Sequence, residues 1–278
     1  MESEKILKCK LINMRKNDWK LPEDIKAYDF LMEVMPYLGS VDSELRDDLV
    51  LTGIYEVMNS YNLTTKNLEN ILKVCLGDEY LFNRIGSIGE DAVFKRTFSI
   101  LVVVGVLYIN NEKDKVLLSR EQILDIYYDI INYCKRERDF RGYVYGKGWA
   151  HSTAHTADCL YYLAQNEAIK YEELIEILQV IREKICIYNY VYINGEDERL
   201  TTAVMSVLSR NIINIDEIQK WISSFMPVNI PCKLHEKMNL QENIKIFMRS
   251  LFFRLRNSNG LEEIMDTIEI LLKKLEEI

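Results

Sequence analysis

The stretch Trp149–Ala164 reads WAHSTAHTADCLYYLA and contains no Lys, Arg or Glu in sixteen residues. Small, apolar and aromatic residues occupy most of its positions, which is the composition of a helix covered on all sides. Two of the three histidines of the chain, His151 and His155, lie here four residues apart, and Asp158 follows three residues later. Positions i, i+4 and i+7 share one helix face, so we expect these three side chains to converge inside the protein.

The rest of the chain also has a helical pattern. Only 11 Gly and 4 Pro occur among 278 residues, which favours long helices with short connections. The hydrophobic content of 48% and the charged content of 28% are typical of a globular protein. Ser119 precedes a helical segment that has Glu121 in its first turn, as at a capped helix start. We predict a single all-α domain over residues 1–278, with about 11 helices.

Five helical segments recur at similar intervals, near residues 45–59, 91–109, 149–165, 197–210 and 243–256. Their starts are separated by 46, 58, 48 and 46 residues, and the longest interval contains an extra loop at 139–148. Helix-pair solenoids of the HEAT and armadillo type repeat every ~40–47 residues. The spacing therefore favours a right-handed α–α superhelix whose concave face is lined by these five helices. An irregular helical bundle would give similar intervals and is the alternative.

Charge, cysteine spacing and hydropathy restrict the class of protein. The net charge is −8 and no block of five like charges occurs, so nucleic acid is not the expected partner. No two of the six cysteines are closer than 25 residues, which predicts free thiols in a reducing compartment. The longest apolar run, Ile100–Ile109, is far shorter than the ~20 residues of a membrane span. We expect a cytoplasmic protein with no membrane partner.

The histidine face allows three interpretations. His151, His155 and Asp158 are candidate ligands of a divalent metal ion, zinc or manganese, because histidines at i and i+4 can reach one ion. An open position on that ion would support catalysis by bound water. The same three residues could instead serve a binding or catalytic site without a cofactor. They could also form a closed hydrogen-bond network that ties helices together.

The loop before this helix is rich in glycine and positive charge. Glycines let a backbone approach a ligand closely, and a helix N-terminus offers N–H groups to an anion. We expect acids and an arginine from the next repeat to face the same pocket. The predicted ligand-binding residues are Arg141, Gly146, Lys147, Gly148, Trp149, Glu196, Asp197 and Arg199. The alternative is structural, with glycines closing a tight turn and acids at helix starts.

Residues 141–158, RGYVYGKGWAHSTAHTAD, resemble the hallmark RGYVxGKGWAHxxAHxAD of a bacterial family catalogued as domain of unknown function 2785. The matching positions are Arg141, Gly142, Gly146, Gly148, Trp149, His151, His155 and Asp158. Further similar segments are RDDL at 46–49, EDAVFKRTFS at 90–99, GEDERL at 195–200 and FMRSLFFRL at 247–255. The resemblance covers roughly residues 30–275. It implies an all-helical bacterial protein and no particular activity.

These observations favour a binding module with a central polar pocket for a small anionic molecule or a peptide. The alternative is a metal-dependent hydrolase that uses His151, His155 and Asp158. A third interpretation is structural, with a partner protein docked on the concave face. The sequence does not decide whether the protein is an enzyme.

Overall fold

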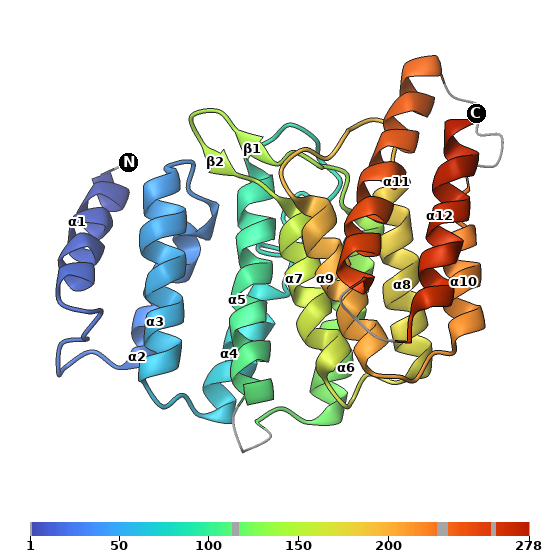
Figure 1. Cartoon of the computed structure of the whole chain (residues 1–278). Helices are drawn as coiled ribbons and strands as arrows, with labels where there is room; N and C mark the ends of the chain where they lie inside the picture. The colour runs from blue at the N-terminus through green and yellow to red at the C-terminus, as the bar shows by residue number, and fades with distance from the viewer. Residues whose placement is uncertain (1, 113–116, 227–232, 257–259, 278) are drawn as a thin grey trace. The chain divides into compact units, whose positions relative to one another are not determined.

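A computed structural model describes residues 2–112, 117–226, 233–256 and 260–277. Over these residues the chain forms twelve α-helices, a short 3-10 helix, a short π-helix and one two-stranded hairpin, so the all-α prediction is confirmed (Figure 1). Two compact units make up the chain: a first unit, Met1–Cys159, and a second unit, Leu160–Ile278. Each is described by itself below. The superhelix and the single domain concern the placement of these units and stay predictions.

The first unit contains the following elements in chain order. They are α1 (Glu2–Lys16), α2 (Ala27–Val34), the 3-10 helix η1 (Met35–Gly39), the π-helix η2 (Glu44–Leu51), α3 (Thr52–Ser60), α4 (Thr65–Cys75), α5 (Ala92–Glu112), α6 (Arg120–Arg136), β1 (Tyr143–Val144) and β2 (Gly148–Trp149). Helix α7 (Ser152–Gln165) begins in this unit. The predicted N-cap at Ser119 is confirmed, because its hydroxyl accepts a hydrogen bond from the Gln122 N–H at 3.3 Å.

The second unit is built from α8 (Tyr171–Ile185), α9 (Glu196–Ser209), α10 (Ile215–Ser223), α11 (Leu234–Leu255) and α12 (Glu262–Glu276). Helix α9 packs on α11, and α10 packs on α12 (Figure 1). The rings of Phe225 and Phe247 stack in its core with centroids 5.7 Å apart. The segment predicted at 243–256 starts nine residues earlier than expected, because the helical pattern of α11 continues back to Leu234.

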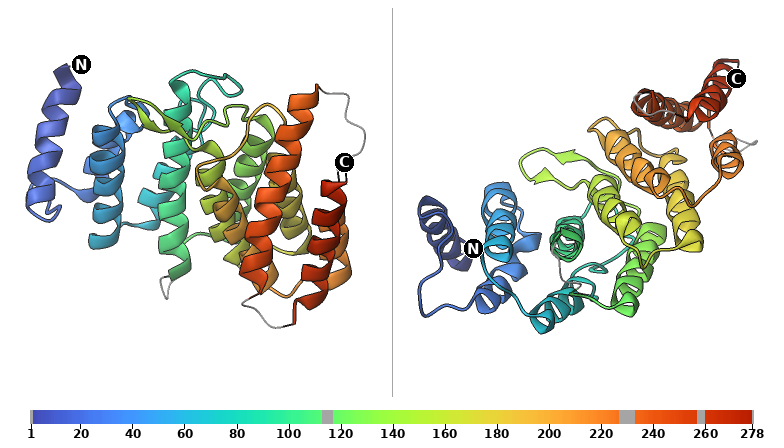
Figure 2. Two further views of the ribbon diagram at one scale, coloured as in Figure 1. Left: turned by 45° about the horizontal axis from the view of Figure 1, so that its top comes forward. Right: turned by 60° about the horizontal axis from the view of Figure 1, so that its bottom comes forward.

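Helix α5 is the core helix of the first unit. Helices α3 and α4 both lie beside it (Figure 2). Its 20-residue segment Ala92–Asn111 is long and apolar enough to cross a bilayer, although 78% of its most apolar window is buried inside the protein. Burial of most of its surface explains the largely apolar sequence of this helix.

Candidate functional site

The residues that precede α7 form an antiparallel hairpin. Strands β1 and β2 pair Tyr143 with Trp149 and Val144 with Gly148 (Figure 1). Gly146 lies in the turn with a φ of 75°, a conformation that glycine adopts without strain. We call residues 141–151 the hallmark hairpin, because they contain the glycine-rich part of the sequence hallmark.

Pairing across the hairpin continues beyond the two strands and sets the start of α7. The Ala150 N–H donates to the Gly142 carbonyl at 2.9 Å, and the His151 N–H donates to the Arg141 carbonyl at 3.0 Å. His151 also has a φ of 48°, which is outside the α-helical range. The predicted helix start at residue 149 is therefore wrong: the helix begins at Ser152, three residues later.

A buried arginine on η2 holds the turn of the hairpin. Arg46 is fully buried, and its Nη2 donates to the Lys147 carbonyl at 2.8 Å. Its Nη1 donates to the Ser40 carbonyl at 2.7 Å. The guanidinium lies over the rings of Phe94 and Phe98, 4.2 and 4.6 Å from their centroids. These contacts fix the hairpin to both η2 and α5.

Gly148 allows the hairpin backbone to pack closely on η2. Its φ is 81°, and a Cβ at this position would lie 2.6 Å from Ser43 Cβ and 2.9 Å from Arg46 Nη2. At Gly146, by contrast, a Cβ would meet nothing within 4 Å. The close approach that glycine permits at Gly148 is thus an approach to a neighbouring helix.

Both predicted cations of the hairpin are engaged in ion pairs. Lys147 Nζ lies 2.7 and 2.8 Å from the two carboxylate oxygens of Asp91. Arg141 donates to Asp139 through Nε at 2.8 Å and Nη2 at 2.6 Å, and its Nη2 also donates to the Glu90 carbonyl at 2.9 Å. An anion at this position would have to compete with two carboxylates.

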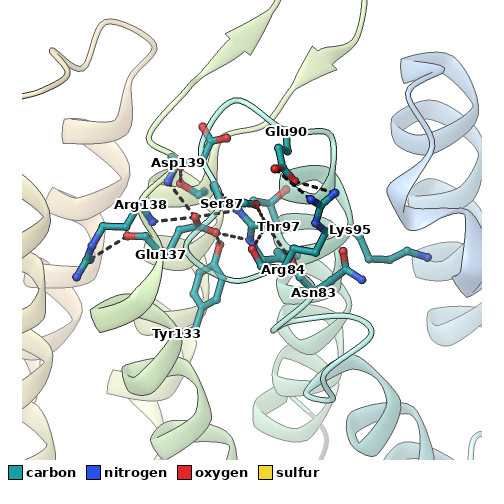
Figure 3. Close-up of polar contacts among 12 residues, drawn as sticks. Asn83, Arg84, Ser87, Glu90, Lys95, Thr97, Tyr133, Glu137, Arg138 and Asp139 are labelled. Atoms are coloured by element: carbon teal, nitrogen blue, oxygen red, sulfur yellow. Dashed lines mark hydrogen bonds and ion pairs between the residues drawn. The ribbon is translucent and has the colours of Figure 1, made fainter.

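A buried polar network supports the chain at the end of α6 (Figure 3). Glu137 accepts hydrogen bonds from Arg96 Nε at 2.6 Å and Nη2 at 2.9 Å. It also accepts from the Tyr133 hydroxyl at 2.8 Å and from the backbone N–H groups of Arg138 and Asp139, each at 2.9 Å. Burial raises the pKa of Tyr133 well above its usual value, so its hydroxyl keeps the proton that it donates. The network positions Asp139, the partner of Arg141.

His151, which immediately precedes α7, and His155, which lies within α7, have neighbouring side chains. Their ring centroids are 5.8 Å apart in an edge-to-face arrangement. His155 is buried and has its ring 5.4 Å from that of Phe98, whereas His151 is half-buried. Asp158, half-buried, follows His155 by three residues on α7. The predicted proximity of the two imidazoles is therefore present although His151 lies outside the helix.

Metal coordination by these residues stays a prediction. Over residues 2–112, 117–226, 233–256 and 260–277, no group of three or more His, Cys, Asp or Glu side chains is arranged to hold a metal ion. An ion held by His151 and His155 would need a further ligand that no described residue supplies in this arrangement.

Three aromatic side chains of the hairpin are exposed. Trp149 stacks on His151, with centroids 4.4 Å apart and ring planes 21° from parallel. Tyr143 lies edge-on to Trp149 at 5.0 Å. Tyr145, at the turn, is 96% exposed. We call Tyr143, Tyr145 and Trp149 the hairpin aromatics.

The predicted site residues of the second unit lie at the start of α9. The predicted position of Glu196 and Asp197 in a first helical turn is confirmed. Glu196 is buried and accepts a hydrogen bond from the Asn194 N–H at 2.8 Å, and Asp197 accepts one from the Ser250 hydroxyl on α11. Arg199 follows on the same helix. The common pocket of these residues with the histidines involves both units and stays a prediction.

The sequence is similar to one protein family over more than half of its length. The family described as "Protein of unknown function (DUF2785)" matches residues 81–253. The chain belongs to this family. No curated protein and no solved structure matches it. The residues matched to DUF2785 include the whole hallmark hairpin and the Arg96–Glu137 network, whereas Arg46 precedes them.

Three residues that hold the hallmark hairpin in place were not among the predicted ligand-binding or metal-binding residues: Arg46, Asp91 and Asp139. Arg46 and Asp91 lie in the segments RDDL and EDAVFKRTFS, which resemble the family. Their contacts with the hairpin could not be predicted from local sequence, because Lys147 is 101 residues from Arg46 and 56 residues from Asp91. Asp139 is two residues from its partner Arg141, and this spacing was the only local signal.

The stability of this DUF2785 protein should depend on the ionisation of Asp47. Burial raises the pKa of Asp47 to about 6 from an ordinary 3.8, against the opposing effect of Arg46, whose Nε lies 2.7 Å from Asp47 Oδ1. The folded protein thus holds this proton more tightly than the unfolded chain does. The contribution of the protonated carboxyl to stability is complete below pH 3.8 and is lost as the pH rises through about 6.

We therefore expect the unfolding free energy of the wild type, relative to that of Asp47→Asn, to fall between pH 4 and pH 6 and then to level off. Urea unfolding at pH 4, 5, 6 and 7 measures this difference. Asp48→Asn, which removes an exposed neighbouring carboxylate, controls for the change in net charge. A difference that stays constant or rises over this range would contradict the prediction.

Proposed function

We propose that this protein is a helical-repeat binding module in which the hairpin aromatics contact a peptide segment of a partner protein. The observation that carries this proposal is the exposure of three aromatic side chains on one short hairpin. Tyr145 is 96% exposed, Tyr143 54% and Trp149 38%. Exposed tyrosine and tryptophan supply large contact areas with few rotatable bonds, and they are enriched at binding hot spots.

The rigid attachment of the hairpin supports the same proposal. Arg46 holds its turn, Asp91 binds Lys147, and Asp139 binds Arg141. A surface that is already ordered loses less conformational entropy when it binds a partner. Loops held by a rigid scaffold are also where binding residues concentrate.

A peptide is favoured over a small anion at this position. The two cations that would attract an anion, Lys147 and Arg141, are already paired with carboxylates. Peptide recognition needs no free charge, because aromatic surfaces bind extended and proline-rich segments through stacking and apolar contact. The net charge of −8 also favours a partner segment that is neutral or basic.

The wider setting of this proposal is a cytoplasmic protein whose helices stack as a right-handed superhelix of the HEAT type. The intervals of 46, 58, 48 and 46 residues between repeated segments support the superhelix. Five free cysteines among the described residues are compatible with a reducing compartment.

A phage-displayed library of random peptides, selected against the full chain, tests the proposal. We expect the selected peptides to bind the double variant Tyr145→Ala/Trp149→Ala at least ~10-fold more weakly than the wild type, since hot-spot truncation costs ~2 kcal/mol or more. Calorimetry measures the affinities. Tyr128→Ala is the matched control, because this tyrosine is 57% exposed on α6. Selection of no peptide that distinguishes the wild type from the double variant would refute the proposal.

A metal-dependent hydrolase that uses His151, His155 and Asp158 is the second candidate. The 5.8 Å separation of the two imidazole rings favours it, because rings that share one zinc ion lie roughly 5–6 Å apart when Zn–N is about 2.0–2.1 Å. Metal analysis of protein purified without a polyhistidine tag tests this. Stoichiometric zinc or manganese that is lost in His151→Ala would favour the hydrolase, and metal-free folded protein would remove it.

A further inference from the structure

An open cleft of about 620 Å³ lies in the first unit, apart from the hairpin aromatics. It is lined by residues from α1, η1, the loop before α5 and the first turn of α5. A volume between ~300 and 1,000 Å³ is typical of sites for small molecules. Polar groups that face the cleft include Tyr37, Ser40, Asn83 and Lys95. The cleft thus has both the size and the hydrogen-bonding groups for a small polar ligand.

Lys95 is the cation of this cleft that has no carboxylate partner. Its ammonium donates a hydrogen bond to the Pro36 carbonyl and lies 4.7 Å from the centroid of the Tyr80 ring. No ion pair joins it to any Asp or Glu of the described ranges 2–112, 117–226, 233–256 and 260–277. Burial lowers the pKa of Lys95, and the opposing effects of Cys75 and of the Glu79 carboxylate, which forms no ion pair with it, are smaller.

Two other charged residues that line the cleft, Asp91 and Arg84, are already in ion pairs. Asp91 pairs with Lys147 at 2.7 Å, and Arg84 pairs with Glu90 at 2.9 Å. The carboxylate of Glu4 accepts the Ser40 hydroxyl at 2.8 Å. A ligand that brings a negative charge to Lys95 would therefore complete an ion pair without breaking one.

The fold positions the Lys95 side chain toward this cleft. A Cβ at Gly39 would lie 2.9 Å from Lys95 Cε and 3.0 Å from Lys95 Cβ, so the lysine stem runs close along the last residue of η1. Figure 3 shows Lys95 extending away from the Glu137 network to which its neighbour Arg96 contributes. Of these two consecutive residues of α5, Arg96 therefore binds Glu137 in the buried network and Lys95 lines the cleft.

We infer that this cleft binds a small molecule that carries an oxyanion, either a carboxylate or a phosphate group, which pairs with the Lys95 ammonium. Lysine binds both groups as a point charge. The backbone of Ala92, in the first turn of α5, also lines the cleft at a helix end that attracts negative charge. This site is independent of the hairpin aromatics.

Calorimetric titration of the full chain with inorganic phosphate and, separately, with succinate tests the inference and distinguishes the two anion chemistries. We expect at least one probe to bind the wild type at least 10-fold more tightly than Lys95→Met, which keeps an unbranched stem and removes the charge. Lys95→Arg should retain most of the affinity. Lys20→Met, which removes an exposed lysine charge, should bind like the wild type. Equal affinity of the wild type and Lys95→Met for both probes, or no binding of either, would overturn the inference.

A second measurement needs no variant at this site. Reductive methylation followed by mass spectrometry reports how accessible each lysine is. The probe that binds should slow methylation of Lys95 and leave that of Lys20 unchanged, and an unchanged rate at Lys95 would overturn the inference. The double variant Tyr145→Ala/Trp149→Ala should show the same protection of Lys95, which separates this site from peptide binding at the hairpin.

Discussion

Replacement of Arg96 by methionine should lower the free energy of unfolding by about 3–5 kcal/mol. Arg96 and Glu137 are 0% and 1% exposed, and their closest N–O distance is 2.6 Å. Removal of one member of a buried ion pair leaves the other charge without compensation, and this is the costly case. The remaining Glu137 would keep the Tyr133 hydroxyl and two backbone N–H groups as donors, which limits the loss but does not replace a positive charge.

Urea unfolding measures this loss. Lys10→Met is the matched control: Lys10 pairs with Glu33 at 2.7 Å, but their side chains are 34% and 48% exposed. Exposed pairs contribute about 0–1 kcal/mol, so the control should be close to the wild type. The double variant Arg96→Met/Glu137→Leu should lose less than the sum of the two single changes, because neither charge is then left alone. A loss below about 1 kcal/mol for Arg96→Met would show that the pair does not stabilise the fold.

Gly148→Ala should destabilise the protein by about 2–5 kcal/mol. The substitution adds two costs. A φ of 81° is strained for any residue with a Cβ, and the new methyl group would lie 2.6 Å from Ser43 Cβ and 2.9 Å from Arg46 Nη2. Backbone strain of this kind costs about 1–3 kcal/mol, and overpacking costs a similar amount.

Gly146→Ala separates these two costs. Gly146 has a similar φ of 75°, but a Cβ there would meet nothing within 4 Å. We expect a loss of about 1–2 kcal/mol from the left-handed conformation alone. Thermal unfolding and hydrogen exchange at the His151 N–H, which bonds to Arg141 at 3.0 Å, report on the hairpin directly. Equal losses for the two variants would show that contact with η2 does not hold Gly148 in place.

Several parts of the candidate site followed from local sequence. The helical pattern predicted a helix near residues 91–109, and α5 spans Ala92–Glu112. Ser119 caps α6 as its position suggested. The proximity of His151 and His155 was also predicted, although for a reason that proved incomplete: hairpin pairing and a φ of 48° place His151 before the helix.

The roles of the two cations in the hallmark hairpin, Arg141 and Lys147, could not be predicted from local sequence. Arg141 and Lys147 have the pattern of an anion site when taken alone, since the sequence does not reveal which carboxylates reach them. Their partners are Asp139 and Asp91, and the second of these is 56 residues away from Lys147. Lys95, the lysine that lines the neighbouring cleft, forms no ion pair with a carboxylate. Nothing in the local sequence distinguished it from the other lysines of the chain.

The sequence by itself determined the all-α class, the buried character of α5 and the concentration of glycine, histidine and aromatic residues before α7. These features depend on residues within one or two helical turns of each other, where periodicity and capping act. Tertiary structure alone decided which charges distant in sequence are paired, because Lys147 meets Asp91 across 56 residues and Arg96 meets Glu137 across 41. Ion pairing depends on distance in space, and only the packing of helices brings such residues within about 3 Å.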